Sequence, residues 1–333
     1  YGVSPNPMVG CVIVRDGNVI AEGWHRRAGE AHAEVDALSR CSDARGATMY
    51  VTLEPCSHHG RTPPCADAVI ASGVERVVVA MADPNEIVAG RGIERLRAAG
   101  IEVTTGVSEA EARRLNEKYV WSISEKLPFV LLKAAMSADG KLATSGGESQ
   151  WITGEDARQK SLALREEFDA ILVGGGTIKT DNPRLTRRLG LGSTSWTRVV
   201  LDGDGDVPAH AQVFGDGART LLFTSRPPVD GSQSVEVVPV EGRVDIRTVL
   251  GELYSRGVTS VIVEGGPVVL AEMLTRDLWQ KMVLFVAPMF IGGGATHSIF
   301  GGSPATRLTD ARRFRFDRVE SVGRDLMITA YPG

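Results

Sequence analysis

Cysteine is scarce in this chain: only four of its 333 residues are cysteine. So few thiols do not make the disulfide framework of a small secreted domain. We therefore expect a reducing, cytoplasmic compartment, with any special cysteine serving a metal ion or catalysis. No apolar run approaches the ~20 residues that span a bilayer, so no membrane association is expected. No signal peptide is recognisable in residues 1–5; because the chain starts with Tyr1, the earlier removal of a leader stays open.

Aromatic residues and net positive charge are sparse as well. Phe, Trp and Tyr make up 6% of the chain, and the formal net charge is −4. A nucleic-acid-binding groove usually combines positive charge with aromatic rings on which bases stack. We therefore expect no nucleic-acid partner. The hydrophobic content of 43% is typical of a globular chain, and the length predicts about two domains.

Strand and helix patterns alternate along the whole chain, which favours two layered α/β domains. In the first part we expect strands at 9–14, 19–23, 48–53, 74–80 and 101–106, and helices at 31–40, 65–72, 92–99 and 109–124. The turn signal Asp16-Gly17-Asn18 predicts that the first two strands form a hairpin. In the second part we expect strands at 129–135, 170–173, 199–201, 220–224, 258–264 and 282–286, helices at 154–167 and 268–274, and surface loops at 189–195 and 226–234. The helix at 109–124 ends at Lys126-Leu127-Pro128. The predicted division is a domain at 1–122, a linker at 123–128 and a domain at 129–333.

One group of residues indicates a metal centre. His32-Ala33-Glu34 is followed by Pro55-Cys56 and by Cys65. One imidazole and two thiolates form a three-ligand zinc set that leaves the fourth position to water. Glu34 would not be a ligand but would shuttle a proton from that water to a leaving amine, as in zinc-dependent base deaminases.

The spacing within this group constrains its geometry. A separation of two residues does not align His32 and Glu34 on one face of a helix, so the pocket must wrap around the first helical turn. His58 and His59 are rival ligand candidates; we interpret one as a substrate contact and the other as exposed to solvent. Cys11 and Cys41 are interpreted as small buried hydrophobic residues.

The motifs in the first part resemble those of the bifunctional riboflavin-biosynthesis deaminase–reductases. The resemblance rests on Asn6–Cys11, on His32–Glu34 and above all on the twelve-residue run Glu54–Cys65, and it continues through Asp83-Pro84-Asn85 to the C-terminus. Members of that family usually begin with a short helix before the Asn-Pro motif, most of which is missing here.

This resemblance implies a cytidine-deaminase-like three-layer first domain. Its reaction would be the hydrolytic deamination at C2 of a diaminopyrimidinone ribosylamine 5'-phosphate. The matching positions make His32, Cys56 and Cys65 the Zn²⁺ ligands and Glu34 the catalytic proton shuttle. The positions that match the substrate pocket are Asn6, His25, His58, Arg61, Asp83 and Asn85. A phosphorylated substrate requires a cation such as Arg61; without the resemblance, Asp83-Pro84-Asn85 would be a turn after a strand.

Three glycine clusters mark the second part: Gly174–Gly176, Gly265-Gly266 and Gly292–Gly294. None matches the GxGxxG fingerprint of a dinucleotide-binding Rossmann domain. The first two follow apolar strands directly, where backbone N–H groups and a following helix N-terminus can bind phosphate. Tight turns without a ligand are the alternative interpretation.

The same family resemblance extends over this second part and implies a dihydrofolate-reductase-like domain. It would use NADPH to reduce the ribosylamino group to a ribitylamino group; the choice of NADPH over NADH depends on the family alone. Matching cofactor positions are Ala135, Trp151, Thr177, Asp181, Gly265, Gly266, Pro267, Val268, Val269 and Leu270. Matching substrate positions are Lys133, Ser149, Arg165, Leu185, Arg188 and Glu264. Arg165 and Arg188 suit a 5'-phosphate, whereas Asp139 is interpreted as a turn-capping residue.

The sequence therefore predicts a zinc hydrolase joined to an NADPH-dependent oxidoreductase. We further expect a homo-oligomer formed through the reductase domain. Two alternatives stay open. One is a deaminase of another nucleoside-like substrate with an appended reductase-like domain. The other is a structural zinc module, which would need a fourth protein ligand and would not need Glu34.

Overall fold

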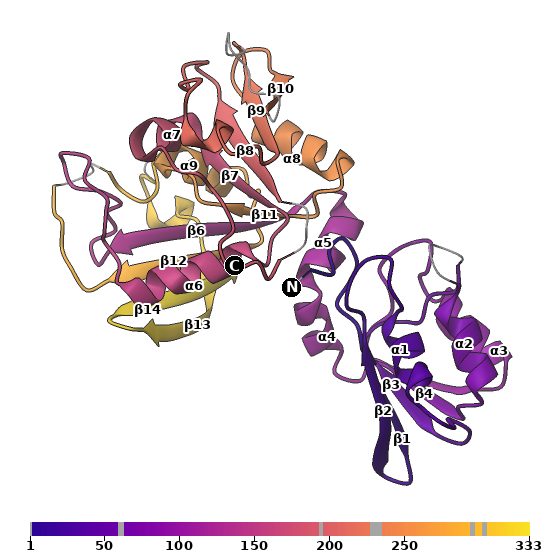
Figure 1. The fold of residues 1–333 in the computed structure, drawn as a ribbon. Coiled ribbons are helices and arrows are strands. Elements are labelled where there is room, and N and C mark those ends of the chain that lie inside the picture. The colour runs from indigo at the N-terminus through magenta and orange to yellow at the C-terminus, as the bar shows by residue number, and fades with distance from the viewer. Residues whose placement is uncertain (1, 59–62, 193–195, 227–234, 294–296, 302–304) are drawn as a thin grey trace. The chain divides into compact units, whose positions relative to one another are not determined.

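A computed structural model describes residues 2–58, 63–192, 196–226, 235–293, 297–301 and 305–333. The chain forms two compact units, Gly2–Leu127 and Pro128–Gly333 (Figure 1). Each unit has helices packed on a β-sheet, so the predicted α/β class is confirmed. Among the described residues, none of the helices is both long enough and apolar enough for a membrane span.

The first unit is built on a five-stranded sheet with the order β2-β1-β3-β4-β5. β1 and β2 form the predicted hairpin, and positive φ at both Asp16 and Gly17 matches a two-residue type I′ turn. β1 also pairs antiparallel with β3, whereas β3, β4 and β5 are parallel. The strands are β1 (Gly10–Arg15), β2 (Asn18–Trp24), β3 (Thr48–Val51), β4 (Arg76–Val79) and β5 (Glu102–Thr105).

Three helices share a core with this sheet: α1 (Ala33–Ser39), α2 (Cys65–Ser72) and α3 (Arg91–Ala98). Their buried side chains contact apolar strand residues such as Met49 and Val77. α1 lies so close to β2 that a Cβ on Gly23 would be 2.2 Å from the backbone nitrogen of Ala37. This packing fixes the start of α1, where His32 and Glu34 lie.

The predicted single helix at 109–124 is wrong. The structure has two helices there, α4 (Glu109–Leu115) and α5 (Glu117–Glu125), which meet at Asn116. The side chain of Asn116 accepts a hydrogen bond from Met8 N at 2.7 Å and donates one to Met8 O at 2.9 Å. This long-range contact, which the local pattern does not contain, favours the interruption. The last turn of α5 also occupies the first residues of the expected linker.

The second unit contains a nine-stranded sheet with the order β10-β9-β8-β7-β11-β6-β12-β14-β13. The seven strands from β10 to β12 are parallel, and β14 and β13 add an antiparallel edge. The strands are β6 (Phe129–Ser137), β7 (Ala170–Gly174), β8 (Thr197–Asp202), β9 (Thr220–Thr224), β10 (Val235–Pro239), β11 (Ser260–Val263), β12 (Lys281–Ala287), β13 (Phe314–Val322) and β14 (Asp325–Pro332). Its helices are α6 (Glu155–Arg165), α7 (Gly175–Asp181), α8 (Ile246–Ser255) and α9 (Pro267–Thr275), with short 3₁₀ turns at Gln212–Phe214 and Leu308–Asp310.

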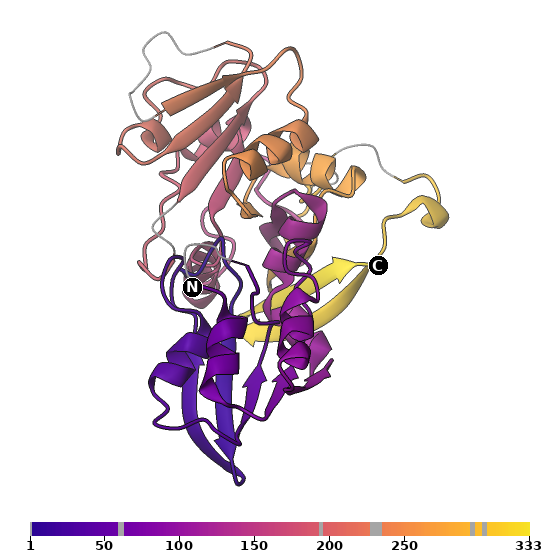
Figure 2. The same cartoon turned by 90° about the vertical axis from the view of Figure 1, so that its right-hand side faces the viewer.

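The central strands β8, β9 and β11 are buried along their whole length, as expected for parallel strands covered on both faces. The sequence reading missed β10, α7, α8 and the C-terminal hairpin of β13 and β14, which is drawn in yellow in Figure 2. Alternation of apolar and polar residues around Phe314 and Phe316 was a usable signal for β13. Helix α7 was hidden because it begins with two glycines, which are poor helix formers.

Candidate active sites

Three side chains from separate segments of the first unit meet at one point. His32 directly precedes α1, Cys56 lies in the loop after β3, and Cys65 is the first residue of α2. Their ligand atoms all lie within 4.8 Å of one another. His32 Nδ1 is 3.1 Å from Cys65 Sγ and 3.6 Å from Cys56 Sγ. The structure therefore brings the three predicted metal ligands together.

The chemistry of this donor set fits zinc. The hydrogen bond from the Cys65 thiol lowers the pKa of Cys56 to about 4, assisted by His32 and by the backbone N–H of Cys65, which lies 3.3 Å from Cys56 Sγ. The contact with Cys56, together with burial, raises the pKa of Cys65. A divalent cation bound here would take both sulfurs as thiolates. One imidazole and two thiolates then leave one zinc position for water.

Within the described part of the chain, the metal-ligating cluster has no fourth His, Cys, Asp or Glu member. A catalytic zinc site has three protein ligands and a water, whereas a structural site has a fourth protein ligand. Of the two rival histidines, His58 is exposed and does not belong to the cluster, and His59 lies outside the described residues.

Glu34 is placed beside the metal cluster by the first turn of α1. His32 is the N-cap residue with an extended backbone (φ −74°, ψ 163°), and Glu34 is the second helical residue. The cluster thus wraps around the start of the helix, as the two-residue spacing predicted. Glu34 is buried; burial raises its pKa to about 7, and its carboxyl group contacts the Cys65 thiol.

Asn6 and His25 form a second layer behind His32. The His25 ring packs edge-to-face against His32 with centroids 5.2 Å apart. His25 Nδ1 lies 3.0 Å from the carbonyl oxygen of Ala31, and Nε2 lies 3.0 Å from Asn6 Nδ2. Because a carbonyl only accepts, Nδ1 carries the proton and Nε2 accepts from the Asn6 amide. The structure therefore places two of the predicted substrate residues next to the metal cluster.

Asp83 and Asn85 lie in a loop after β4. One carboxylate oxygen of Asp83 accepts from the Asn85 N–H and from the Tyr119 hydroxyl, both at 2.9 Å. Burial raises the pKa of Asp83, and the hydrogen bonds from the Asn85 N–H and the Tyr119 hydroxyl act in the opposite direction. The predicted phosphate contact Arg61 lies outside the described residues. Tyr119, which comes from α5, was missed because nothing local connects it with Asp83.

Glu54, the first residue of the run Glu54–Cys65, has a role in this site that the sequence did not predict. Its buried carboxylate accepts four backbone N–H groups, from Asp83, Gly90, Gly92 and Ile93, at 2.9–3.2 Å. It therefore ties the Pro55-Cys56 loop to the Asp83 loop and to the start of α3. A Cβ on Gly92 would be 1.9 Å from the carbonyl oxygen of Pro55, so the contact requires glycine.

In the second unit, an ion-pair cluster lies where adjacent parallel strands β6 and β11 run side by side. Lys133 lies in β6, and Glu264 follows β11. Glu264 accepts hydrogen bonds from Arg165 Nε at 2.7 Å and Nη2 at 2.9 Å, and it lies 3.5 Å from Lys133 Nζ. Burial would raise the pKa of Glu264, but the charges of Lys133 and Arg165 outweigh it and lower the pKa to about 2. Three predicted substrate residues thus form one cluster.

The first two glycine clusters follow the neighbouring strands β7 and β11 and open helices α7 and α9. A Cβ on Gly266 would lie 3.8 Å from Thr177 Oγ1, so the two predicted cofactor segments are in contact. Within the predicted run from Gly265 to Leu270, Val268 is exposed, whereas Val269 and Leu270 are buried and form the base of the segment. The parallel strands therefore bring both helix N-termini to one edge of the sheet, where their N–H groups could bind a phosphate.

The remaining predicted reductase residues lie in α7, in β6 and in the segment between β6 and α6. Burial raises the pKa of Asp181, at the end of α7, and a hydrogen bond from Ser149 opposes this rise. Trp151 is 65% exposed and stacks on Arg158 at 4.7 Å, so it is not a core residue. Ala135 lies in β6 beside Lys133. Asp139 accepts from the N–H groups of Ile291 and Gly292, at 3.1 and 2.7 Å, and so anchors that loop as a structural residue.

Leu185 and Arg188 lie in the segment between α7 and β8. Leu185 is buried at a positive φ of 54°, and Arg188 is exposed. The Arg188 side chain forms no ion pair with any residue that the structure describes. A buried carboxylate, Glu166, accepts from the N–H groups of Arg188, Leu189, Leu191 and Gly192 at 2.9–3.2 Å. Glu166 was missed, although it shapes the loop that carries Arg188.

These two sites define an enzyme class: a zinc-dependent deaminase joined to a reductase. Two family models match the chain, the cytidine and deoxycytidylate deaminase zinc-binding region over residues 1–81 and the RibD C-terminal domain over residues 128–328. Similar curated proteins include the riboflavin biosynthesis protein RibD of Aquifex aeolicus, 41% identical over 97% of this chain and 92% of its own. The RibD protein of Escherichia coli is 39% identical over 98% of this chain and 94% of its own.

Solved structures agree with this assignment. A deaminase–reductase from Thermotoga maritima, named as acting on diaminohydroxyphosphoribosylaminopyrimidine and 5-amino-6-(5-phosphoribosylamino)uracil, matches with a TM-score of 0.92 and 38% identity. The match covers 100% of this chain and 94% of that one. RibD of Acinetobacter baumannii matches with a TM-score of 0.91 and 35% identity, with the same coverage. The chain belongs to the RibD family of bifunctional riboflavin-biosynthesis deaminase–reductases, which confirms the predicted cytidine-deaminase-like and dihydrofolate-reductase-like domains and the predicted use of zinc and NADPH.

Proposed function

We propose that the chain catalyses two consecutive reactions on one phosphorylated pyrimidine. The first unit removes the C2 amine of 2,5-diamino-6-(ribosylamino)pyrimidin-4-one 5'-phosphate, and the second reduces the ribosyl side chain of the product to ribityl. The observation that carries the proposal is the convergence of His32, Cys56 and Cys65 within 4.8 Å, next to the buried Glu34. The name of the Thermotoga relative supports the substrate.

In the deamination, Glu34 moves the protons. His32, Cys56 and Cys65 would hold zinc, which when bound lowers the pKa of water towards 7. The carboxylate of Glu34 takes a proton from the attacking water and delivers it to the amine, which leaves as ammonia. Its place on the first turn of a packed helix keeps the carboxyl group beside the cluster. Asn6 and His25 support the ring of His32 from behind and border the substrate.

In the reduction, the second unit aligns substrate and cofactor. NADPH, when bound, supplies the hydride. Thr177, Asp181, Trp151, Ala135 and the Gly265–Leu270 segment would contact the cofactor. Ring opening of the ribosylamine exposes an imine-like carbon; this carbon accepts the hydride and its nitrogen accepts a proton. Lys133, in the middle of β6, and Glu264, directly after β11, would hold the open sugar chain, while Ser149, Leu185 and Arg188 complete the substrate pocket.

The test is a coupled assay on the purified chain. Ammonia release is measured from the diaminopyrimidine ribosylamine phosphate, and the oxidation of NADPH is then followed, with NADH in parallel. Ammonia release followed by NADPH oxidation supports the proposal. Deoxycytidylate serves as the competing substrate: if the chain releases ammonia from it and not from the diaminopyrimidine, the proposed substrate is wrong.

We also propose that the chain forms a homo-oligomer through its reductase unit. The edge strand β13 exposes Phe314, Phe316 and Val319. A long edge strand with exposed apolar side chains is a site of pairing with another chain. Light scattering on the purified protein tests this, and Phe316→Lys should lower the measured mass. A wild-type mass of about 36 kDa, near the 35.6 kDa of one chain, would contradict it.

We propose a cytoplasmic location as well, because Cys56 and Cys65 must stay reduced to bind a metal ion. In the structure all four cysteines are free. Fractionation of cells that produce the native chain tests the location.

A further inference from the structure

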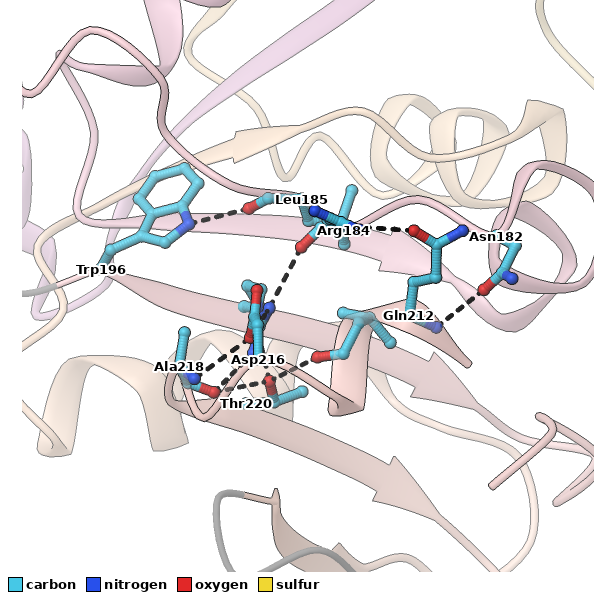
Figure 3. Close-up of polar contacts among 10 residues, drawn as sticks. Asn182, Arg184, Leu185, Trp196, Gln212, Asp216, Ala218 and Thr220 are labelled. Carbon is cyan, nitrogen blue, oxygen red and sulfur yellow. Dashed lines mark hydrogen bonds and ion pairs between the residues drawn. The ribbon is translucent and has the colours of Figure 1, made fainter. Parts of the chain in front are cut away.

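Arg198, the second residue of β8, is a fully buried cation in the reductase unit. Its guanidinium group donates to four acceptors from two segments, residues 216–220 and Arg184, and these acceptors are labelled in Figure 3. Nε donates to Thr220 Oγ1 at 3.0 Å, and Nη2 donates to the carbonyl oxygen of Ala218. Nη1 contacts the carbonyl oxygen of Arg184 at 3.1 Å and the carboxylate of Asp216 at 2.7 Å.

Burying a charge is costly unless it is paired and hydrogen-bonded. Asp216 supplies the counter-charge. Burial would raise the pKa of Asp216, but the N–H of Ala218 and the guanidinium group of Arg198 lower it. An apolar residue at this central strand position would avoid the desolvation cost. The arginine is therefore best explained by the groups that it holds. Three of its four acceptors belong to residues 216–220, and the fourth is the backbone carbonyl of Arg184, in another segment of the chain.

Arg184 belongs to a segment, residues 182–186, that three further contacts fix, one of them from Arg184 Nε to Gln212 Oε1 at 3.0 Å (Figure 3). The indole N–H of Trp196 donates to the carbonyl oxygen of Leu185 at 2.9 Å. Asn182 Oδ1 accepts from the backbone N–H of Gln212 at 2.8 Å. Asn182 and Leu185 have φ values of 42° and 54°, and for a residue such as leucine this conformation is unfavourable. Such a backbone persists only where its surroundings over-determine it.

The other side of this segment faces the ion-pair cluster of the reductase site. The carbonyl oxygen of Thr186 accepts from Arg165 Nη1 at 3.2 Å, and Arg165 is paired with Glu264. The segment thus begins one residue after the predicted cofactor contact Asp181 and carries the predicted substrate contact Leu185. Arg198 of β8 binds the segment at the carbonyl oxygen of Arg184, and Arg165 of the reductase site binds it at the carbonyl oxygen of Thr186.

We propose that Arg198 is a positioning residue of the reductase. It fixes residues 182–186 so that Leu185 and the Arg165–Glu264 pair are presented to the phosphorylated substrate. Because it is fully buried, Arg198 itself does not touch the substrate. The proposal deepens the proposed reductase function and rests on it.

The test compares Arg198→Lys with wild type in the full chain. Lysine keeps the charge but not the planar fork that reaches several acceptors at once. We expect the reductase KM for the phosphorylated substrate to rise at least tenfold with kcat within about threefold. Amide hydrogen exchange in residues 183–189 should become faster. Zinc content and ammonia release by the first unit are the internal control, and Arg247→Lys, an exposed arginine of α8, is the matched substitution.

Three outcomes would overturn the proposal: an unchanged KM, unchanged amide hydrogen exchange in residues 183–189, or a fall in kcat alone. A fall in kcat alone would mean only that a smaller fraction of the protein is folded. If Arg198→Lys does not fold, Trp196→Phe tests the same segment, because it removes one hydrogen bond to Leu185 and keeps a ring. It should raise KM roughly 2- to 12-fold, the effect of one ordinary hydrogen bond; no change in KM counts against the proposal. A wild-type chain that does not oxidise NADPH refutes the reductase function instead.

Discussion

The carboxylate of Glu264 is held by Arg165 through two hydrogen bonds of 2.7 and 2.9 Å. Both residues were predicted to contact substrate, and Arg165 was predicted to bind the 5'-phosphate. The third nitrogen of Arg165 donates to Thr186, so all of its guanidinium nitrogens are engaged within the protein. Arg188, which is exposed, is therefore the better candidate for the phosphate. We propose that Arg165 orients Glu264.

Because of this pairing, we expect the reductase unit to lose stability as the pH falls into the acidic range. The pKa of Glu264 is lowered from 4.5 to about 2, so its contribution is complete above about 4.5 and is lost as the pH falls through 2. The shift corresponds to about 3 kcal/mol. Glu264→Gln should destabilise the reductase unit by about this amount at pH 7 and by less at pH 3.

The measurement is amide hydrogen exchange in β6 and β11 of the full chain at both pH values. Glu148→Gln, at an exposed position of the same unit, is the control. A Glu264→Gln effect that is equally large at pH 3 and pH 7 would contradict the assignment.

The metal centre can be tested by removing zinc. We expect one zinc ion per chain by elemental analysis, and a chelator should abolish ammonia release while NADPH oxidation on the deaminated intermediate continues. Cys65→Ser should lose the metal, whereas Cys41→Ser, outside the cluster, should keep it. If chelation abolishes both activities together, the two units do not act independently.

The role of Glu34 predicts a separation of binding from turnover. Glu34→Gln should retain zinc, because Glu34 is not part of the ligand cluster, and should lower deamination by at least 10²- to 10⁴-fold through loss of proton transfer. NADPH oxidation on the deaminated intermediate serves as the control within the same chain. Near wild-type ammonia release would remove Glu34 from the mechanism.

The carboxylate of Glu54 is predicted to support the metal loop. Glu54→Gln weakens four hydrogen bonds that join the Cys56 loop to the Asp83 loop and α3. Loss of such outer contacts typically weakens metal binding 10- to 100-fold. Competition with a zinc-binding dye measures the affinity, and Glu75→Gln, an exposed change in the same unit, should leave it unaltered. Equal affinity in the two variants would show that Glu54 does not act on the site.

Two separate phosphate contacts predict opposite kinetic phenotypes. Arg61→Ala should raise the KM of deamination and spare the reduction, and Arg188→Ala should do the reverse. A charge-assisted hydrogen bond contributes about 1.5–3 kcal/mol, which corresponds to roughly 10- to 150-fold in the affected reaction. Steady-state kinetics of both reactions on each variant provide the measurement. Equal losses in both reactions from either change would indicate one shared phosphate site.

Local sequence was sufficient where the chemistry lies in a short motif. His32, Glu34, Cys56 and Cys65 could be assigned from their types and spacing, because zinc accepts few donor sets and a deaminase needs a proton shuttle nearby. The α/β class followed from the alternation of apolar strands and helices, and the hairpin at Asp16-Gly17 followed from turn chemistry. These features depend on residues close together in the chain.

Only the tertiary structure decided the contacts that join distant segments. The break at Asn116 depends on Met8, the Asp83 loop depends on Glu54 and Tyr119, and the engagement of Arg165 depends on Glu264 and Thr186. The buried Arg198 reads in sequence as an ordinary charged residue at the start of an apolar strand. Its role appears only where Thr220, Ala218 and the Arg184 carbonyl surround it, because the energy of a buried charge depends on the partners that the fold places around it.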